Sequence, residues 1–163
     1  MTVRSVRIFK SVLAAALATA VLSLLFTLKA QLGLIPRFEL IRWLTDIGHS
    51  GFGTPDGARA VGWTAHAAIG TLLWGGIFGM FYERCPGTSD LEKGLAIGIA
   101  AWLAMMVVLM PFTCGGPFGI NIGLGATLMP LIFCLVYGAV LGLAYAALQL
   151  ESPLKIQSRR PSI

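Results

Sequence analysis

The feature that most constrains this chain is an uncharged stretch of 57 residues between Lys93 and Glu151. A helix that crosses the roughly 30 Å hydrocarbon core of a bilayer needs about 20 apolar residues, so this stretch is too long for one crossing. Its middle part, 111–125, contains five glycines and two prolines, which interrupt regular helices. The stretch therefore predicts two membrane-spanning helices, about 94–110 and 126–148, joined by a glycine-rich connector.

Two earlier segments are also apolar enough to span a membrane. Residues 11–32 follow a basic N-terminal segment and form an apolar run longer than the roughly 7–15 residues of a signal-peptide core. We therefore expect a retained first helix and not a cleaved leader. Residues 60–82 contain no Asp, Glu, Lys or Arg and predict the second span.

The segment between these two spans has a different character. In residues 36–48, Phe38, Ile41 and Leu44 recur at intervals of three, while the charged side chains fall at other positions. This spacing is typical of an amphipathic helix. The segment is short and charged, so we expect it to lie in the membrane interface and not to cross the bilayer.

Composition agrees with a membrane protein. Hydrophobic residues make up 56% of the 163 residues and charged residues 12%, against about 45–50% and about 25% in soluble domains. The apolar runs are continuous and do not alternate, which argues against a transmembrane barrel. We expect an all-α membrane protein with one four-helix domain over 1–163 and spans at about 11–32, 60–82, 94–110 and 126–148.

The distribution of basic residues predicts an orientation. With the N-terminus inside, the cytoplasmic segments hold eight basic residues and the outer segments four: Arg4, Arg7, Lys10, Arg84, Lys93, Lys155, Arg159 and Arg160 against Lys29, Arg37, Arg42 and Arg59. Positive residues favour the cytoplasmic side, so both termini are expected there. The net charge of +5 lies at chain ends and connectors, which suits a lipid bilayer as partner and not a nucleic acid.

Two segments resemble each other within the chain. Trp74-Gly75-x3-Gly79-x2-Tyr82 and Tyr137-Gly138-x3-Gly142-x2-Tyr145 match at an offset of 63 residues. This match predicts two related helical hairpins with the interfacial helix inserted in the first. The alternative is chance similarity between glycine-rich membrane helices.

Small residues one turn apart let helix backbones approach closely in lipid. Such pairs occur in each predicted helix, at Ala14/Ala18, Ala16/Ala20, Gly75/Gly79, Gly94/Gly98 and Gly138/Gly142. We expect Gly75, Gly79, Gly138 and Gly142 to meet in one central seam between the two hairpins.

His66 is the one clearly ionisable side chain inside a predicted span, and such a residue is a candidate for function. It could ligate a haem iron, hydrogen-bond a quinone or relay a proton. The alternative is a neutral histidine that is bonded to a nearby partner. At regular helical spacing it shares a face with Gly70, Leu73 and Ile77 and lies opposite Gly75 and Gly79.

Other candidate sites are weaker. His49 could pair with His66 around a haem, but no CxxCH motif is present for covalent attachment. Cys85, Cys114 and Cys134 lack metal-binding spacing, so we expect neither a metal site nor a disulfide. The connector 111–125 either dips back into the bundle around Thr113 and Asn121 or forms a tight outer turn. No spaced catalytic set occurs, and we expect no enzyme activity and no cofactor.

Three stretches carry a resemblance: LKAQLGLIPRFELIRWL, HAAIGTLLWGGIFGMFY and LVYGAVLGLAY. In these the chain resembles a group of small, uncharacterised four-helix bacterial membrane proteins that are classed as domains of unknown function. The resemblance covers roughly residues 10–148 and implies a location in the bacterial inner membrane without an assigned activity. In that group a histidine often precedes LVYG; this chain has Cys134 at that position, which argues against a shared histidine site.

Two functions follow as hypotheses. The first is an accessory or scaffold bundle that packs with itself or with a larger membrane complex. The second is a small redox or transport element that uses His66 and the connector 111–125.

Overall fold

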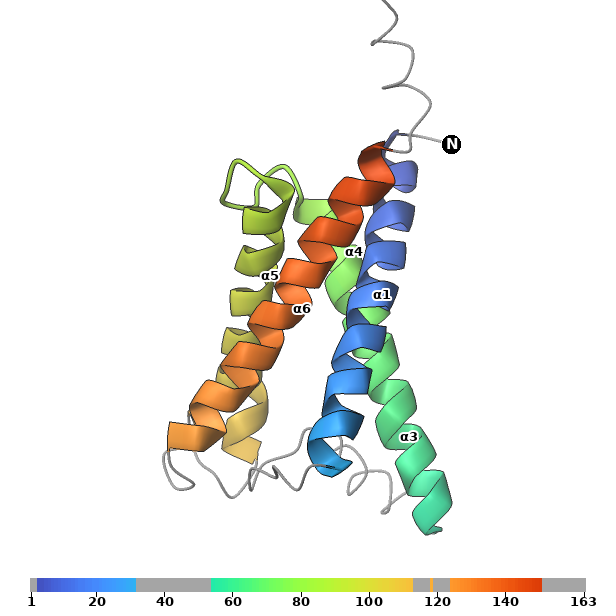
Figure 1. The fold of residues 1–163 in the computed structure, drawn as a ribbon, viewed down its shortest axis with the longest axis vertical. Helices are drawn as coiled ribbons and strands as arrows, with labels where there is room; N and C mark the ends of the chain where they lie inside the picture. Colours follow the sequence, from blue (N-terminus) through green and yellow to red (C-terminus); the bar gives the residue numbers. More distant parts are fainter. Residues whose placement is uncertain (1–2, 32–53, 113–117, 119–123, 151–163) are drawn as a thin grey trace, which may run out of the picture.

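The structure is a computed structural model, and it describes residues 3–31, 54–112, 118 and 124–150. Apart from Thr54 and the turn at 82–89, these residues are helical, and they include no strand. Four helical rods are long and apolar enough to cross a membrane by length and composition (Figure 1). The predicted all-α class with four helices of spanning length is therefore confirmed, while the predicted interfacial helix at about 36–48 lies outside the described residues.

Each rod is longer or more complex than a simple apolar span. The first is α1 (Val3–Gln31), which begins well before the predicted start of the span at residue 11. The second joins α3 (Pro55–Ala68), the π-helix η1 (Ile69–Trp74) and α4 (Gly75–Phe81). The third joins α5 (Asp90–Ala104), the π-helix η2 (Met105–Leu109) and the 3-10 turn η3 (Met110–Phe112). The fourth is α6 (Leu124–Leu150).

Local sequence signals explain where the two middle rods begin. Thr54 caps α3 by accepting a hydrogen bond from the Gly57 amide, and Pro55 occupies the first turn, where its missing N–H costs nothing. Ser89 and Glu92 form a capping box at the start of α5, satisfying two backbone donors that the helix leaves free. In the turn before it, Gly87 adopts a φ of 121°, which glycine tolerates without strain.

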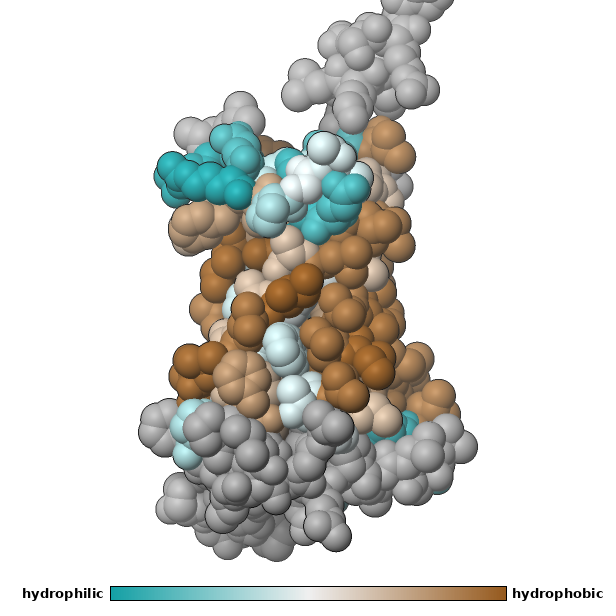
Figure 2. All heavy atoms as spheres, turned by 90° about the vertical axis from the view of Figure 1, so that its left-hand side faces the viewer, coloured by the Kyte–Doolittle hydropathy of each residue, from teal (hydrophilic) through white to brown (hydrophobic). Residues whose placement is uncertain are grey.

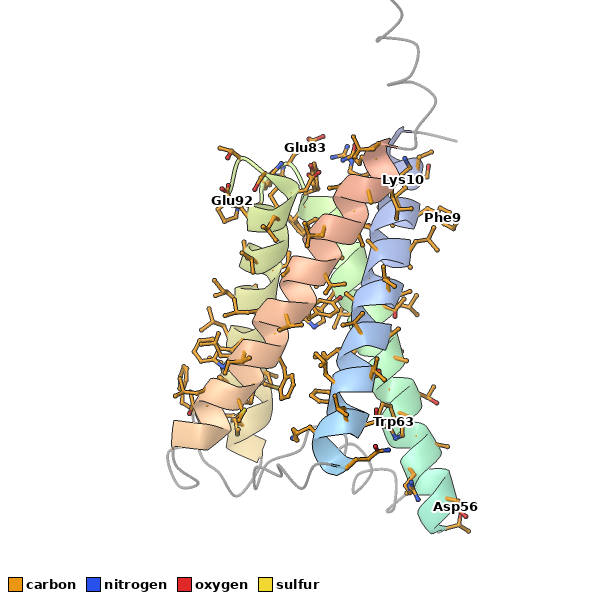
Figure 3. All side chains as sticks on the ribbon, in the orientation of Figure 1. Phe9, Lys10, Asp56, Trp63, Glu83 and Glu92 are labelled. Atoms are coloured by element: carbon orange, nitrogen blue, oxygen red, sulfur yellow. The ribbon has the colours of Figure 1, made fainter. Side chains whose placement is uncertain are left out.

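Three contacts between rods organise the bundle. α5 packs along α6, α1 packs against α6, and α1 also packs against η1 and α4 of the second rod. The ends of the described chain, at Val3 and Leu150, lie at the same end of the bundle (Figure 1). We call this the Lys10 end and the opposite one the Asp56 end, after residues labelled in Figure 3. A core of alanines, larger aliphatic residues and aromatic residues runs between them: Ala14, Ala15, Ala18, Leu22, Phe78, Ile97, Tyr137, Leu141 and Tyr145.

The glycines form two seams, and the prediction of one central seam is wrong. A Cβ on Gly138 would lie 2.4 Å from the Gly94 carbonyl oxygen, and one on Gly98 would lie 2.4 Å from the Cys134 carbonyl oxygen. These glycines, with Gly142, join α6 to α5. Gly75 and Gly79 instead face α1, where a Cβ on Gly75 would lie 2.6 Å from that of Ala15. Small residues thus mark close contacts correctly, but their partners differ from the expected ones.

The contact between α1 and α6 changes along its length. At the Lys10 end the Lys10 ammonium donates to the Leu148 carbonyl oxygen at 2.8 Å. Toward the Asp56 end the two helices separate (Figure 1), and there the rings of Phe26 and Phe133 meet edge to face with centroids 4.9 Å apart. Side-chain size determines how closely two helices approach. The small alanines of α1 therefore allow a close approach to α6, whereas the large rings of Phe26 and Phe133 hold the two helices apart toward the Asp56 end.

A pair of neighbouring substitutions tests the glycine seams. We expect Gly138→Ala to lower the free energy of unfolding by roughly 1–3 kcal/mol, the range of overpacking, because its Cβ would press on backbone atoms that have little room to move. Gly76→Ala is the matched control, since a Cβ there meets nothing within 4 Å and alanine favours the helix by up to about 1 kcal/mol. Thermal unfolding in detergent measures both. Equal melting temperatures for Gly138→Ala and Gly76→Ala would contradict the seam between α5 and α6.

Candidate functional site

His66 lies in the last turn of α3 and is buried, with 6% of its surface exposed. Its neighbours are aromatic: the Phe26 ring of α1 lies 5.6 Å from the imidazole, centroid to centroid, and the Trp63 ring lies 6.0 Å away at right angles. Phe26 in turn touches Phe133 of α6. The imidazole therefore sits in an apolar environment near the Asp56 end, beside the place where α1 and α6 separate.

The Nε2 atom of His66 has no hydrogen-bond partner among the described residues. In a neutral imidazole Nε2 is a donor in one tautomer and an acceptor in the other. In both cases its capacity to form a hydrogen bond is left unsatisfied in the buried site. Such a group costs about 1–3 kcal/mol of stability. We expected the structural alternative for His66 to include a nearby partner, and at Nε2 the described part of the chain supplies none.

A π-helix begins three residues after His66. η1 (Ile69–Trp74) replaces the usual α-helical hydrogen bonds by longer-range ones, an arrangement that often occurs at functional sites. The Tyr137 hydroxyl of α6 donates to the Gly70 carbonyl oxygen at 2.6 Å. Since Tyr137 is itself buried, this hydrogen bond satisfies its hydroxyl in an apolar interior and ties α6 to the π-helix.

Polar side chains from α1 complete this region. The Thr19 hydroxyl donates to the Ala15 carbonyl oxygen at 2.8 Å and lies 3.5 Å from the Thr71 hydroxyl. Gly70 leaves room for Thr19, because a Cβ on Gly70 would lie 2.5 Å from its hydroxyl oxygen. We call Thr19, Gly70, Thr71 and Tyr137 the polar node. It lies where α1, η1 and α6 meet, and its recorded hydrogen bonds are internal to the bundle.

The π-helix also changes which residues share a face with His66. We expected Leu73 beside His66 and Gly75 opposite it. In the structure His66 and Gly75 are both buried, whereas Leu73 is 52% exposed. A π-turn takes up an additional residue, so the regular spacing used for the prediction does not hold across η1. The expected places of Leu73 and Gly75 were therefore wrong, whereas Gly70 and Ile77 of the expected face do contact the bundle interior.

A second polar cluster lies at the Lys10 end. Tyr82 donates a hydrogen bond to Asp90, and the Lys93 ammonium lies 4.0 Å from the centre of the Tyr82 ring. Burial, with a further contribution from the Asp90 hydrogen bond, raises the pKa of the Tyr82 phenol, so the phenol stays protonated and continues to donate. Nearby, Arg7 pairs with Glu83 at 2.6 Å. This cluster joins the connector after α4 to the starts of α1 and α5.

The remaining predicted site residues are not brought together. His49, Cys114 and most of the connector 111–125 lie outside the described residues. Cys85 and Cys134 are free thiols. The described part of the chain holds no group of three or more His, Cys, Asp or Glu side chains that could bind a metal ion.

Sequence reasoning missed the polar node. Tyr137 was noted as part of the glycine repeat, but its hydroxyl was not considered. A signal was available, because a buried tyrosine in an apolar helix needs a hydrogen-bond acceptor. Thr19 and Thr71 gave no such signal, since threonines in helices commonly bond to their own backbone.

An apolar replacement tests whether the imidazole is only packing. We expect His66→Leu to melt at or slightly above the wild-type temperature in detergent, because it removes a desolvated atom without a partner and keeps most of the volume. His66→Ala is the control and should destabilise the protein by leaving a cavity. A loss of more than about 1 kcal/mol in His66→Leu would show that the imidazole makes a stabilising hydrogen bond after all.

Comparison with protein families identifies a match over most of the chain. A model described as a family of unknown function, DUF6789, matches residues 5–155. No curated protein and no solved structure matches the chain.

Proposed function

The chain belongs to DUF6789, a family of unknown function, and we propose that it is an integral membrane protein that acts as an accessory or scaffold bundle. In this proposal it lies in a bacterial inner membrane, both termini are cytoplasmic, and it packs with itself or with a larger membrane complex. It has no enzyme activity of its own.

The observation that carries the membrane assignment is the apolar outer surface. Large hydrophobic side chains point outward on every rod, and Leu24, Leu72 and Leu143 each expose more than half of their surface. On the face that Figure 2 displays, the middle of the bundle is largely hydrophobic and hydrophilic residues gather at the Lys10 end. Extended patches of exposed hydrophobic side chains are rare on soluble monomers. Contact with lipid would remove the cost of exposing them to water.

Basic residues support the proposed orientation. Among the described residues five lie at the Lys10 end and two at the Asp56 end: Arg4, Arg7, Lys10, Arg84 and Lys93 against Lys29 and Arg59. An excess of Lys and Arg favours the cytoplasmic side. The Lys10 end is therefore the cytoplasmic end in this proposal.

A duplicated helical hairpin remains part of the proposal. Gly75 and Gly79 contact α1, and Gly138 and Gly142 contact α5. Residues that match in the sequence repeat thus make equivalent contacts with the preceding rod. This equivalence supports two related hairpins, because chance similarity would not require the same packing role.

The scaffold role is supported by how the polar and small residues are used. Apart from His66 Nε2, the described part of the chain has no buried side-chain polar atom without a partner, so few groups are available for chemistry.

Ala14 and Ala18 pack inside the bundle, whereas Ala16 and Ala20 are exposed on α1. This second small stripe would let a further helix approach closely in the membrane.

The unused Nε2 of His66 favours a second candidate, a redox or transport element built on His66 and the connector 111–125. The aromatic rings of Phe26 and Trp63 would suit an apolar ligand with one polar atom, such as a quinone. A haem with His66 as an iron ligand would also make the chain a redox element.

Thiol labelling tests the orientation. In a background without native cysteines, Asp56→Cys should react with a membrane-impermeant maleimide in intact cells, and Thr88→Cys should react only after permeabilisation. Both positions are exposed, and the membrane blocks the charged reagent. The reverse pattern would overturn the orientation, and equal labelling of both in intact cells would contradict a membrane-spanning bundle.

Purification from the native membrane separates the two functions. The scaffold proposal predicts a stoichiometric protein partner or a stable oligomer and no visible absorption band. Ala16→Trp should release the partner, whereas Leu143→Trp, on the exposed face of α6, should not. A Soret band at near-stoichiometric intensity that disappears in His66→Ala would establish the second candidate instead.

A further inference from the structure

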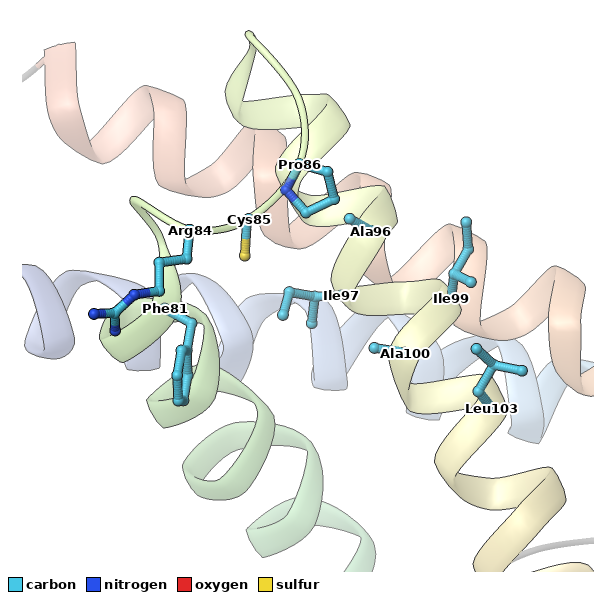
Figure 4. Close-up of a pocket in the computed structure, with 9 residues that line it drawn as sticks. All are labelled: Phe81, Arg84, Cys85, Pro86, Ala96, Ile97, Ile99, Ala100 and Leu103. Carbon is cyan, nitrogen blue, oxygen red and sulfur yellow. The ribbon is translucent and has the colours of Figure 1, made fainter.

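An open groove lies between the second and third rods near the Lys10 end. It has a volume of about 380 Å³ and arises where α4 packs on α1 while α5 packs on α6. In Figure 4, Phe81 and Arg84 form one wall and Ile97, Ala100 and Leu103 the other. The lining is mostly apolar, and Arg84 lies at the rim with its guanidinium directed away from the α5 wall in Figure 4.

The groove has room for part of a lipid acyl chain. Its α5 wall extends from Ala96 to Leu103, roughly 10 Å at the helical rise per residue. Ala96 and Ala100 leave space on this wall, whereas Ile99, Leu103 and Phe81 project around it and are partly exposed. Such a channel is open to the side, as a flexible acyl chain entering from the bilayer requires.

The charges at the rim favour an anion. Arg84 is exposed and has no ion-pair partner among the described residues. The acidic groups of this end are already engaged: Glu83 with Arg7, Asp90 with the Tyr82 hydroxyl, and Glu92 with the Thr88 and Ser89 amides. A guanidinium matches the geometry of a phosphate well.

The other polar groups at the rim add no opposing charge. Cys85 lies between the two walls (Figure 4), and burial raises the pKa of its thiol, although Lys93 acts in the other direction. The thiol is therefore neutral. Lys93, at the start of α5, adds a second positive charge at this end of the bundle, with its ammonium over the Tyr82 ring.

From these features we infer that the groove between α4 and α5 binds one anionic phospholipid, with an acyl chain along Ala100 and Leu103 and the phosphodiester at Arg84. The inference rests on the proposed membrane placement, in which the Lys10 end faces the cytoplasmic leaflet. Basic sites between helices on that side are suited to anionic head groups.

Native mass spectrometry of the full chain in detergent tests this site. Titration with dioleoyl phosphatidylglycerol should give one tightly bound lipid, and dioleoyl phosphatidylcholine should bind more weakly. Arg84→Gln should weaken phosphatidylglycerol binding about fivefold, the effect of one basic residue at a membrane surface. Arg4→Gln, which removes an exposed charge at the same end but outside the groove, should leave it unchanged.

The apolar part of the site has its own variant. Ala100→Trp should fill the groove and abolish tight binding, whereas Val107→Trp, on the exposed surface of the same rod, should not. Equal affinity for the two lipids, or equal effects of Arg84→Gln and Arg4→Gln, would overturn the inference. So would displacement of the lipid by millimolar glycerol 3-phosphate, or a dimer that Ala100→Trp dissociates without loss of lipid.

A separate measurement distinguishes this inference from the proposed function. Extraction of native membranes at alkaline pH should leave wild type and all four variants in the membrane pellet. Release of the wild-type chain would contradict the membrane assignment itself. A chain that stays in the pellet but shows no lipid preference contradicts only the groove site.

Discussion

Backbone contact between α5 and α6 is the constraint on which the arrangement depends. A Cβ on Gly94 would lie 2.2 Å from the Gly138 carbonyl oxygen, so these helices approach as closely as their main chains permit. In the proposed membrane setting, lipid provides no hydrophobic drive for helix association, and close packing must supply the attraction. With α6 held against α5, Tyr137, Leu141 and Tyr145 are left to pack in the common core with Ala14, Ala15 and Ala18 of α1. The second rod then attaches to α1 through Gly75 and Gly79.

The number and type of the helices could be read from the sequence, because a long apolar segment without charges has few alternatives in a membrane. The limits of α1 were harder to predict. Hydropathy marks the part of a helix that suits hydrocarbon, whereas the helical hydrogen bonding of α1 continues to Val3. The capping box at Ser89 and Glu92 was visible in the sequence and would have placed the start of α5 more accurately.

The partners of the small residues and the environment of His66 could not be derived in the same way. A glycine pair shows that some helix comes close, but nothing in the pair says which one. The face of His66 depended on an unbroken helical period, and η1 breaks it. Tyr137 reaches Gly70 over a separation of 67 residues, a relation that only the packing of α6 against η1 establishes.

The π-helix η1 has a consequence for how the second rod can change in evolution. A π-turn is the form that a helix takes when it accommodates one extra residue without a break in the chain. Within this rod His66 precedes the extra residue, and Gly75 and Gly79 follow it. Loss of a single codon within 69–74 would leave both ends helical but rotate one against the other, so that either His66 or the glycines would turn away from α1. Insertions and deletions at this point are therefore coupled to both contacts, although each contact involves different residues.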